Sequence, residues 1–261
     1  MTPATLSTEL ETFPGERFVA EVAGEIVGWA PAFHRANGSV SFWVGVLPAF
    51  RRRGFGGALF SALAAQIGGV RSRGYADGPD GCRFLEARGY VPAGGLRLAL
   101  LDLAAVEPGN APVPGFRAVP LAALLDRLPD VHRVYEALRA DVPRGYPVAP
   151  LHYSEFLTEL DGGLLDRDAS VVVLKGSELV ALSFVLADRE SGRADTDMTG
   201  SLAAYRRRGL ARLAKTDSLR RLRALGIRTV TTSTDETNAA MRALNESLGF
   251  RPAATWTRYA R

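Results

Sequence analysis

The sequence predicts an α/β fold, with helices packed on a mixed sheet, arranged as two similar domains in tandem. The main observation is a duplication, because the stretch 44–57 returns in related form as 199–212. Each copy has an extended run, a turn with three consecutive arginines, and a glycine that opens a helical pattern. Hydrophobic residues make up 47% of the 261 residues, which is enough for two packed cores.

The first half alternates strand-like and helix-like segments up to a break that is rich in proline and glycine, Glu107–Gly115. In order, the expected elements are strands at 17–22, 25–33 and 39–47, helices at 56–66 and 80–88, and a strand at 96–103. The expected division is a first domain over 1–106, a linker over 107–115 and a second domain over 116–261.

The second half contains more elements before its arginine turn than the first half does. In order, we expect a strand at 116–119, helices at 121–140 (interrupted near Pro129) and 153–160, strands at 170–174, 179–186 and 193–201, a helix at 210–225, a strand at 228–233, a helix from Asn238 and a strand at 253–259. The first domain is therefore expected to be a truncated copy of the second.

The arginine turns suit a phosphate group. The first turn of a helix has N–H groups without intrahelical partners, at the positive end of the helix dipole. A glycine at this position lets the backbone approach an anion closely, and arginine side chains add charge and hydrogen bonds. Both copies therefore predict a pyrophosphate-binding loop.

The pattern Arg-x-x-Gly-x-Gly/Ala, at 51–56 and 206–211, resembles the acyl-CoA loop of the GNAT N-acetyltransferase superfamily. Each loop is followed by a later helical segment, 80–90 or 237–250, that ends on glycine and an aromatic residue, as in that family. The resemblance covers most of both halves. It implies a tandem protein with an architecture similar to that of mycothiol synthase, although nothing in the chain identifies that enzyme's substrate.

The resemblance implies acetyl-CoA as the acyl donor. In the second copy, the residues expected to bind it are Thr199, Ser201, Arg206, Arg207, Arg208, Gly209, Leu210, Ala211 and Asn238. In the first copy, they are Val46, Arg51, Arg52, Arg53, Gly54, Phe55, Gly56 and Gly57.

The second copy alone has acids on the strand before its loop. Alternation along 193–199 predicts that Asp195, Asp197 and Thr199 share one face, as candidate catalytic residues. The matching residues of the first copy, Val40, Phe42 and Val44, are apolar. A carboxylate can take the proton of an attacking amine. The alternative is that both aspartates are solvated residues at a strand edge or partners of nearby arginines such as Arg193.

Two further roles follow from the resemblance. The family polarises the acyl carbonyl with a backbone N–H on this strand, which corresponds to Thr199 in the second copy and Val44 in the first. Many relatives place a tyrosine in the later helix to protonate the departing thiolate, and Asn245 occupies that position here. For both asparagines, the alternative is helix capping or a polar position at the surface.

The expected function is transfer of an acetyl group to a primary amine of a small molecule, by direct attack in a ternary complex. Candidates for recognising the acceptor, by location alone, are Glu136, Asp141, Tyr146 and Tyr153. One rival function is non-catalytic binding or sensing of acyl-CoA by both copies. Another keeps the second domain as the enzyme and makes the first a scaffold that has lost CoA.

Composition argues against several other classes of protein. A single cysteine, Cys82, excludes an internal disulfide and fits a reducing cytoplasm, and with three histidines it argues against a metal site. No apolar run of about 18 residues and no signal-peptide pattern is present, so we expect no membrane association. The net charge of +4 is dispersed, and only two of the basic residues are lysines, which fits a GC-rich bacterial genome better than a nucleic-acid site. A monomer or a homodimer is expected.

Overall fold

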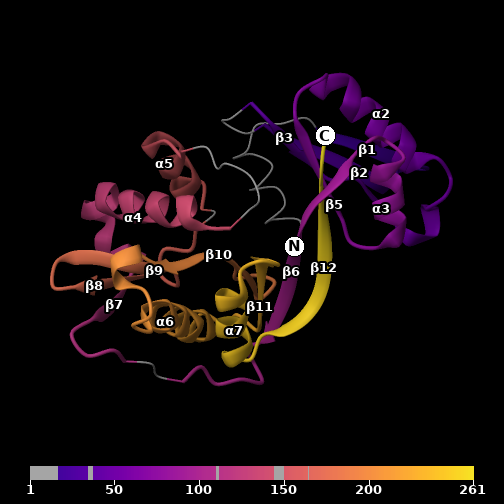
Figure 1. The fold of residues 1–261 in the computed structure, drawn as a ribbon. Coiled ribbons are helices and arrows are strands. Elements are labelled where there is room, and N and C mark those ends of the chain that lie inside the picture. Colours follow the sequence, from indigo (N-terminus) through magenta and orange to yellow (C-terminus); the bar gives the residue numbers. More distant parts are fainter. Residues whose placement is uncertain (1–16, 35–37, 110–111, 144–149, 164) are drawn as a thin grey trace. The chain divides into compact units, whose positions relative to one another are not determined.

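The computed structural model describes residues 17–34, 38–109, 112–143, 150–163 and 165–261. The chain divides into two compact units (Figure 1). The C-terminal unit is Arg97–Ala254, and the N-terminal unit contains the described residues up to Leu96 together with Thr255–Arg261. The final residues, 255–261, are therefore grouped with the N-terminal unit.

The C-terminal unit has a mixed sheet, as the sequence predicted. Its strand order is β6-β11-β10-β9-β8-β7. The strands are β6 (Val91–Asp102, which reaches into this unit), β7 (Arg117–Pro120), β8 (Val171–Lys175), β9 (Glu178–Asp188), β10 (Arg193–Ser201) and β11 (Thr229–Asp235). The β10–β11 pair is parallel, and the pairs β7–β8, β8–β9 and β9–β10 are antiparallel.

Helices cover both faces of this sheet. They are α4 (Leu128–Asp141) and α5 (Tyr153–Asp161) on one face, and α6 (Leu210–Ala224) with α7 (Ala239–Ser247) on the other. The helix expected over 121–140 begins instead as a 3₁₀ segment, Leu121–Arg127, before α4 starts. Pro129 lies in the first turn of α4, where a missing N–H costs nothing, and the interruption expected near it is the boundary at Arg127, whose φ is −121°.

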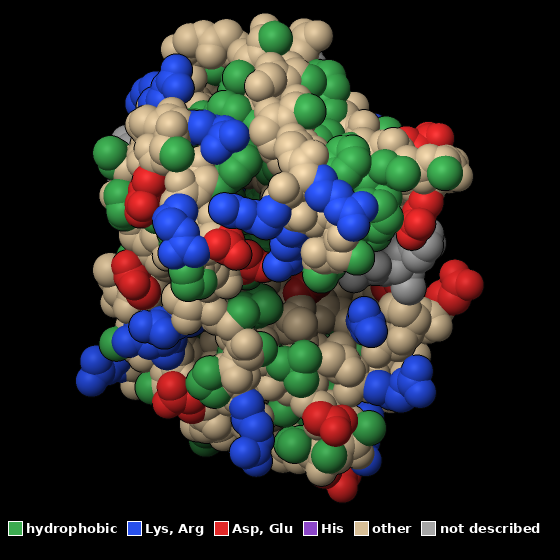
Figure 2. Space-filling model, turned by 90° about the vertical axis from the view of Figure 1, so that its right-hand side faces the viewer, with side chains coloured by type: hydrophobic (Ala, Val, Ile, Leu, Met, Phe, Trp, Pro, Cys, Tyr) green, Lys and Arg blue, Asp and Glu red, His purple; other side chains and the backbone are tan. Residues whose placement is uncertain are grey.

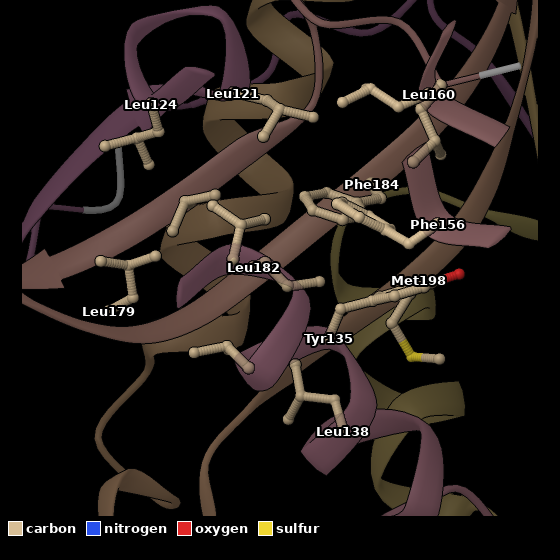
Figure 3. Packing of buried hydrophobic residues seen from close by; sticks show 14 of the residues in the cluster. Leu121, Leu124, Tyr135, Leu138, Phe156, Leu160, Leu179, Leu182, Phe184 and Met198 are labelled. Atoms are coloured by element: carbon tan, nitrogen blue, oxygen red, sulfur yellow. The ribbon is translucent and has the colours of Figure 1, made fainter. Parts of the chain in front are cut away.

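The core between the sheet and α4 shows why the faces are fixed. Leu182 and Phe184 of β9 meet Tyr135 of α4 and Phe156 of α5 (Figure 3), and all four are buried. The alternate β9 residue Ala181 packs in the cluster that contains Leu210 and Ala214 of α6. Side chains alternate between the two faces of the sheet along β9. The β9 residue that pairs with each β10 residue therefore shows on which face that β10 side chain lies.

The N-terminal unit repeats part of this plan. Its strands are ordered β1-β2-β3-β5-β12. They are β1 (Arg17–Val22), β2 (Glu25–His34), β3 (Val40–Phe42), β5 (Ser72–Ala76) and β12 (Arg251–Ala260), with β4 (Gly45–Val46) paired to β2 and with helices α2 (Phe55–Ile67) and α3 (Pro79–Glu86). The single strand expected over 39–47 is divided at Trp43. Its N–H donates to the carbonyl of Pro31 at 3.2 Å, but Pro31 has no N–H to donate in return.

The last strand completes the sheet of the N-terminal unit. In β12, Thr257 pairs with Ala76 and Ala260 with Arg73, antiparallel to β5. The Arg258 Nε atom donates to the carbonyl of Ala93 at 3.1 Å. No helix in the described part of the chain is long and apolar enough to cross a membrane.

Candidate active site

The two arginine loops have the same conformation. A 3₁₀ turn, Pro48–Phe50 or Ala203–Tyr205, precedes each loop. Arg51 has φ −63° and ψ 157°, and Arg206 has φ −65° and ψ 161°. At the next position φ is 63° in both copies, and the glycine that precedes each helix also has a positive φ, 91° in the first copy and 78° in the second. The duplication therefore extends from sequence to backbone geometry.

Each loop holds a strained arginine. Among the described residues, the non-glycine residues with positive φ are Ala23, Arg52 and Arg207, so two of them occupy the same position in the two loops. A bulky residue in this region costs about 1–3 kcal/mol, and such strain is concentrated at binding and active sites.

The helices begin with unused donors. In α6 the N–H of Leu213 bonds the carbonyl of Gly209 at 2.9 Å, and in α2 the N–H of Ala58 bonds that of Gly54 at 3.0 Å. The N–H groups before these have no intrahelical acceptor, because an α-helix bonds i to i−4. Neither first turn contains an acidic residue. Exposed donors, a positive dipole end and three arginines fit the phosphates of an acyl-CoA.

In each unit, side chains contact and stabilise the arginine loop. The guanidinium of Arg208 lies over the ring of Tyr205 at 5.5 Å, and that of Arg53 over Phe50 at 5.3 Å. Arg206 forms an ion pair with Asp141, at the end of α4. Asp141, expected to contact the acceptor, thus holds the loop instead.

The other acceptor candidates show no arrangement around a ligand. Glu136 pairs with Arg139 and accepts the N–H of Leu151 at 2.9 Å. Tyr153 is half-exposed and stacks near Phe156 at 6.4 Å between ring centroids. Tyr146 lies outside the described residues.

Strand β10 separates from β11 partway along its length. The parallel pairing ends at Thr196↔Thr232, whereas β10 continues beside β9 to Ser201↔Ala181. A bulge falls between Thr196 and Met198, so Asp197 is the extra residue of β10. Thr199 and Ser201 lie in the part that separates, where a backbone edge is available to an acyl group.

The bulge corrects one prediction. Asp195 lies opposite Leu186 of β9, and Thr199 lies opposite Ser183, so their side chains are on opposite faces of the sheet. The Thr199 hydroxyl lies 2.9 Å from that of Ser183. The expectation that Asp195, Asp197 and Thr199 share one face is therefore wrong, because an inserted residue reverses the alternation.

Asp195 lines a pocket of about 520 Å³ on the face that carries α4 and α5. The lining residues are Leu100, Asp102, Leu186, Asp188, Ser191, Arg193, Ala194, Asp195, Thr229 and Thr231. Burial raises the pKa of the Asp195 carboxyl, and no donor among the described residues lies within hydrogen-bond distance of it. The site thus contains a poorly solvated carboxylate next to an open volume, which is the environment of a general base.

Asp197 is committed to a structural contact. Its carboxylate accepts a hydrogen bond of 2.7 Å from the hydroxyl of Tyr135 on α4. Burial, with the nearby Asp197 charge, raises the pKa of that tyrosine. The contact ties the bulge to α4, so Asp197 positions the strand beside Asp195.

The two asparagines of the later helix have local roles. Asn238 caps α7, because its side-chain oxygen accepts the N–H of Met241 at 3.1 Å. Asn245 is 3% exposed, and its amide bonds Lys215 at 2.7 Å and Thr234 at 3.2 Å. This burial argues against Asn245 as the residue that protonates a departing thiolate.

Lys215 is the residue that sequence reasoning missed. It lies on the buried side of α6 and is 1% exposed. In the sequence, only its residue type could have drawn attention to it, because this arginine-rich chain contains only one other lysine, Lys175.

The N-terminal unit lacks the acidic part of the site. Val40 and Phe42, which correspond to Asp195 and Asp197, are buried in the core. Beyond the last β3–β5 pair, Phe42↔Gly74, the rings of Trp43 and Tyr75 stack at 5.0 Å and keep the two strands together. This unit therefore keeps the loop without a carboxylate beside the strand.

On the face drawn in Figure 2, acidic and basic side chains are interspersed among hydrophobic ones.

Comparisons with known proteins agree with this geometry. Two family descriptions match the sequence: "Acetyltransferase (GNAT) domain" over residues 14–92 and "Acetyltransferase (GNAT) family" over residues 131–250. No curated protein matches the chain in sequence.

Solved structures show the same fold at low identity. A GCN5-related N-acetyltransferase from Sphaerobacter thermophilus has a TM-score of 0.76 and 18% identity, covering 91% of this chain and 77% of that one. A tandem GNAT protein from the clavulanic acid biosynthesis pathway has a TM-score of 0.75 and 19% identity, covering 98% and 86%. A GCN5-related N-acetyltransferase from Kribbella flavida has a TM-score of 0.63 and 13% identity, covering 98% and 92%. With its two matched segments and its duplicated loop, the chain belongs to the GNAT acetyltransferase family and carries two domains of that family in tandem.

Proposed function

We propose that this protein is an acetyl-CoA-dependent N-acetyltransferase, in which the C-terminal unit transfers the acetyl group to a primary amine of a small molecule. One observation carries the proposal: strand β10 leads into the arginine loop at one end and has a poorly solvated carboxylate beside a pocket at the other. The single cysteine fits a cytoplasmic protein. The protein would be a monomer or a homodimer.

The loop end of β10 would hold the donor. Acetyl-CoA supplies the acetyl group as an activated thioester. The residues proposed to bind its phosphates are Arg206, Arg207, Arg208, Gly209, Leu210 and Ala211, through N–H groups and guanidinium groups. The backbone of Thr199 and Ser201, where β10 leaves β11, would receive the acyl end and polarise its carbonyl.

The pocket end would hold the acceptor. An amine must lose a proton to attack, and a carboxylate whose pKa is raised by burial is a stronger base than a solvated one. Asp195 and Thr199 are four residues apart, roughly 13 Å along an extended strand. Asp195 would therefore receive the proton through a chain of water molecules, while the acceptor lies between the pocket and Thr199.

For the N-terminal unit we propose binding without transfer. Its loop, with Arg51, Arg52, Arg53 and Gly54, has the conformation of the catalytic copy, but Val40 and Phe42 replace the acids. Phe55, Gly56 and Gly57 begin its helix as the second copy's residues do. We also retain as a proposal that 107–115 is a linker between functional domains.

The rival function is non-catalytic acyl-CoA binding. The burial of Asn245, together with two loops of identical geometry, favours it. Detection of any acyl transfer by the protein would exclude this rival function.

Calorimetric titration with acetyl-CoA tests the proposal. The wild-type protein is compared with Gly209→Glu and Gly54→Glu, each of which places a carboxylate where phosphates would bind. We expect Gly209→Glu to abolish binding at one site and acetyl transfer in a screen of amines, measured as released CoA thiol. The matched Gly54→Glu variant should keep transfer. A wild-type protein that binds no acetyl-CoA would overturn the proposal.

A further inference from the structure

A buried lysine lies behind the proposed phosphate loop. The Lys215 Nζ atom donates to Asn245 Oδ1 at 2.7 Å and to Thr232 Oγ1 at 3.4 Å, and it lies 4.7 Å from the centre of the Phe250 ring. The cluster thus brings together α6, α7, β11 and the turn before β12, and Lys215 is 1% exposed.

Among the described residues, no carboxylate pairs with this amine. The residues that face it from α7, β11 and the turn before β12 are neutral: Asn245, Thr232 and Phe250. Burial lowers the pKa of Lys215 to about 7. The amine is therefore available in its neutral form near physiological pH.

Three charged residues on the same elements make contacts with other groups. Asp217 of α6 pairs with Arg221, and Arg212 donates to Ser247. Asp235 of β11 accepts the hydroxyl of Thr237 at 2.6 Å. No counter-charge for Lys215 is visible in the described part of the chain.

The duplicate shows that the fold does not need an amine here. Counted from the glycine before each helix, Phe60 of α2 occupies the position of Lys215. Phe60 is buried among aromatic rings, 5.8 Å from Phe42 and 6.1 Å from Tyr90 between centroids. An apolar side chain thus fills the same site in the copy that lacks the acids.

Lys215 lies close to where negative charge would collect. It is about 9 Å along the axis of α6 from Gly209, given a rise of 1.5 Å per residue. Thr232, one of its partners, is also the last β11 residue paired with β10. Charges at such separations interact appreciably where the surroundings exclude water.

We propose that Lys215 is a buried counter-charge for acyl-CoA: its neutral amine takes up a proton from solvent when the polyanion binds at the C-terminal loop, and releases it when the ligand leaves. The proposal rests on the proposed function of that loop. No bond other than N–H forms or breaks. By linkage, CoA binding at this loop must strengthen as the pH falls through the interval between the free and bound pKa values of Lys215.

Lysine-selective isotope labelling tests this directly, because the chain contains only Lys175 and Lys215. The two NMR signals are assigned with Lys175→Arg and titrated from about pH 6 to 10, a range that covers free and perturbed lysines. Each titration is made without ligand and with saturating CoA, in a Gly54→Glu background that confines CoA to the C-terminal loop. We expect saturation with CoA to raise the Lys215 pKa by about one unit or more.

A second measurement supports the first. Calorimetry of CoA binding in two buffers of different ionisation enthalpy should show proton uptake, which Lys215→Met or Lys215→Gln removes. If CoA binds but the Lys215 pKa stays unchanged, this inference fails while the proposed function stands. If CoA does not bind at the C-terminal loop, the proposed function fails and the inference falls with it.

Discussion

Asp195 combines a functional position with an environment that opposes its charge. Burial raises its pKa above the ordinary 3.8. Between that value and the raised one, the folded protein holds a proton that the unfolded chain does not hold. The contribution of Asp195 to stability is therefore fully present below the ordinary pKa and is lost as the pH rises through the raised pKa. At neutral pH the charged carboxylate destabilises the fold.

Asp195→Asn should consequently raise stability and lower activity. We expect a higher melting temperature at pH 7, a smaller gain near pH 4, and a fall in kcat of about 10²–10⁴-fold, the usual contribution of a general base. Thermal unfolding and steady-state transfer to an amine found by screening measure the two effects. Asp197→Asn is the matched control. It weakens the bond from Tyr135 and should lower stability by about 1 kcal/mol. Wild-type turnover in Asp195→Asn would contradict the assigned role.

Residue identities were more predictable than their orientations. The acids of β10 and the apolar residues of β3 could be found from the duplication. The bulge at Asp197 could not, because one extra residue in a strand leaves no trace in composition or period. The partners of Lys215 were hidden for a similar reason: α7 and β11 are brought to α6 only by the fold.

At the scale of elements, the two loops show how strongly the local sequence determines backbone geometry. Both contain an aromatic residue, three arginines and a glycine, and both have positive φ at the second arginine and at the glycine. This match could be predicted, since each part has a local cause: the glycine tolerates φ > 0, and the aromatic ring receives the third arginine.

Gly54→Ala and Gly209→Ala form a matched pair that separates folding from function. An added Cβ would meet nothing within 4 Å at Gly54 and only Val113 at 3.8 Å at Gly209, so the cost is conformational. We expect each change to lower the free energy of unfolding by roughly 1–2 kcal/mol, the cost of a left-handed non-glycine residue. Only Gly209→Ala should reduce kcat/KM for transfer, by roughly tenfold, equivalent to about 1.4 kcal/mol. Urea unfolding and transfer assays measure both, and an equal loss of transfer in Gly54→Ala would implicate the first unit in catalysis.

At the scale of the whole molecule, each compact unit does not correspond to one uninterrupted half of the sequence. Residues 97–106 precede the proposed linker but belong to the C-terminal unit, while Thr255–Arg261 follow it and belong to the N-terminal unit. The final strand could be predicted from its alternating pattern, but its partner β5 could not, because strand pairing between distant segments is not encoded in either segment alone.

A cut in the linker should therefore leave the two pieces associated. A protease site placed at 107–109 would yield a first piece whose β5 still needs β12, and a second piece whose residues 255–261 lack a partner. We expect the cleaved protein to elute from a sizing column as one species, because separation would expose strand edges and the buried Tyr259. Deleting 255–261 is the complementary change. It removes the bond between Tyr259 and Glu86 along with the strand, and should destabilise the N-terminal unit by several kcal/mol, about the cost of losing one large buried side chain. Pieces that separate on the column and remain folded would show instead that each half of the sequence completes its own domain.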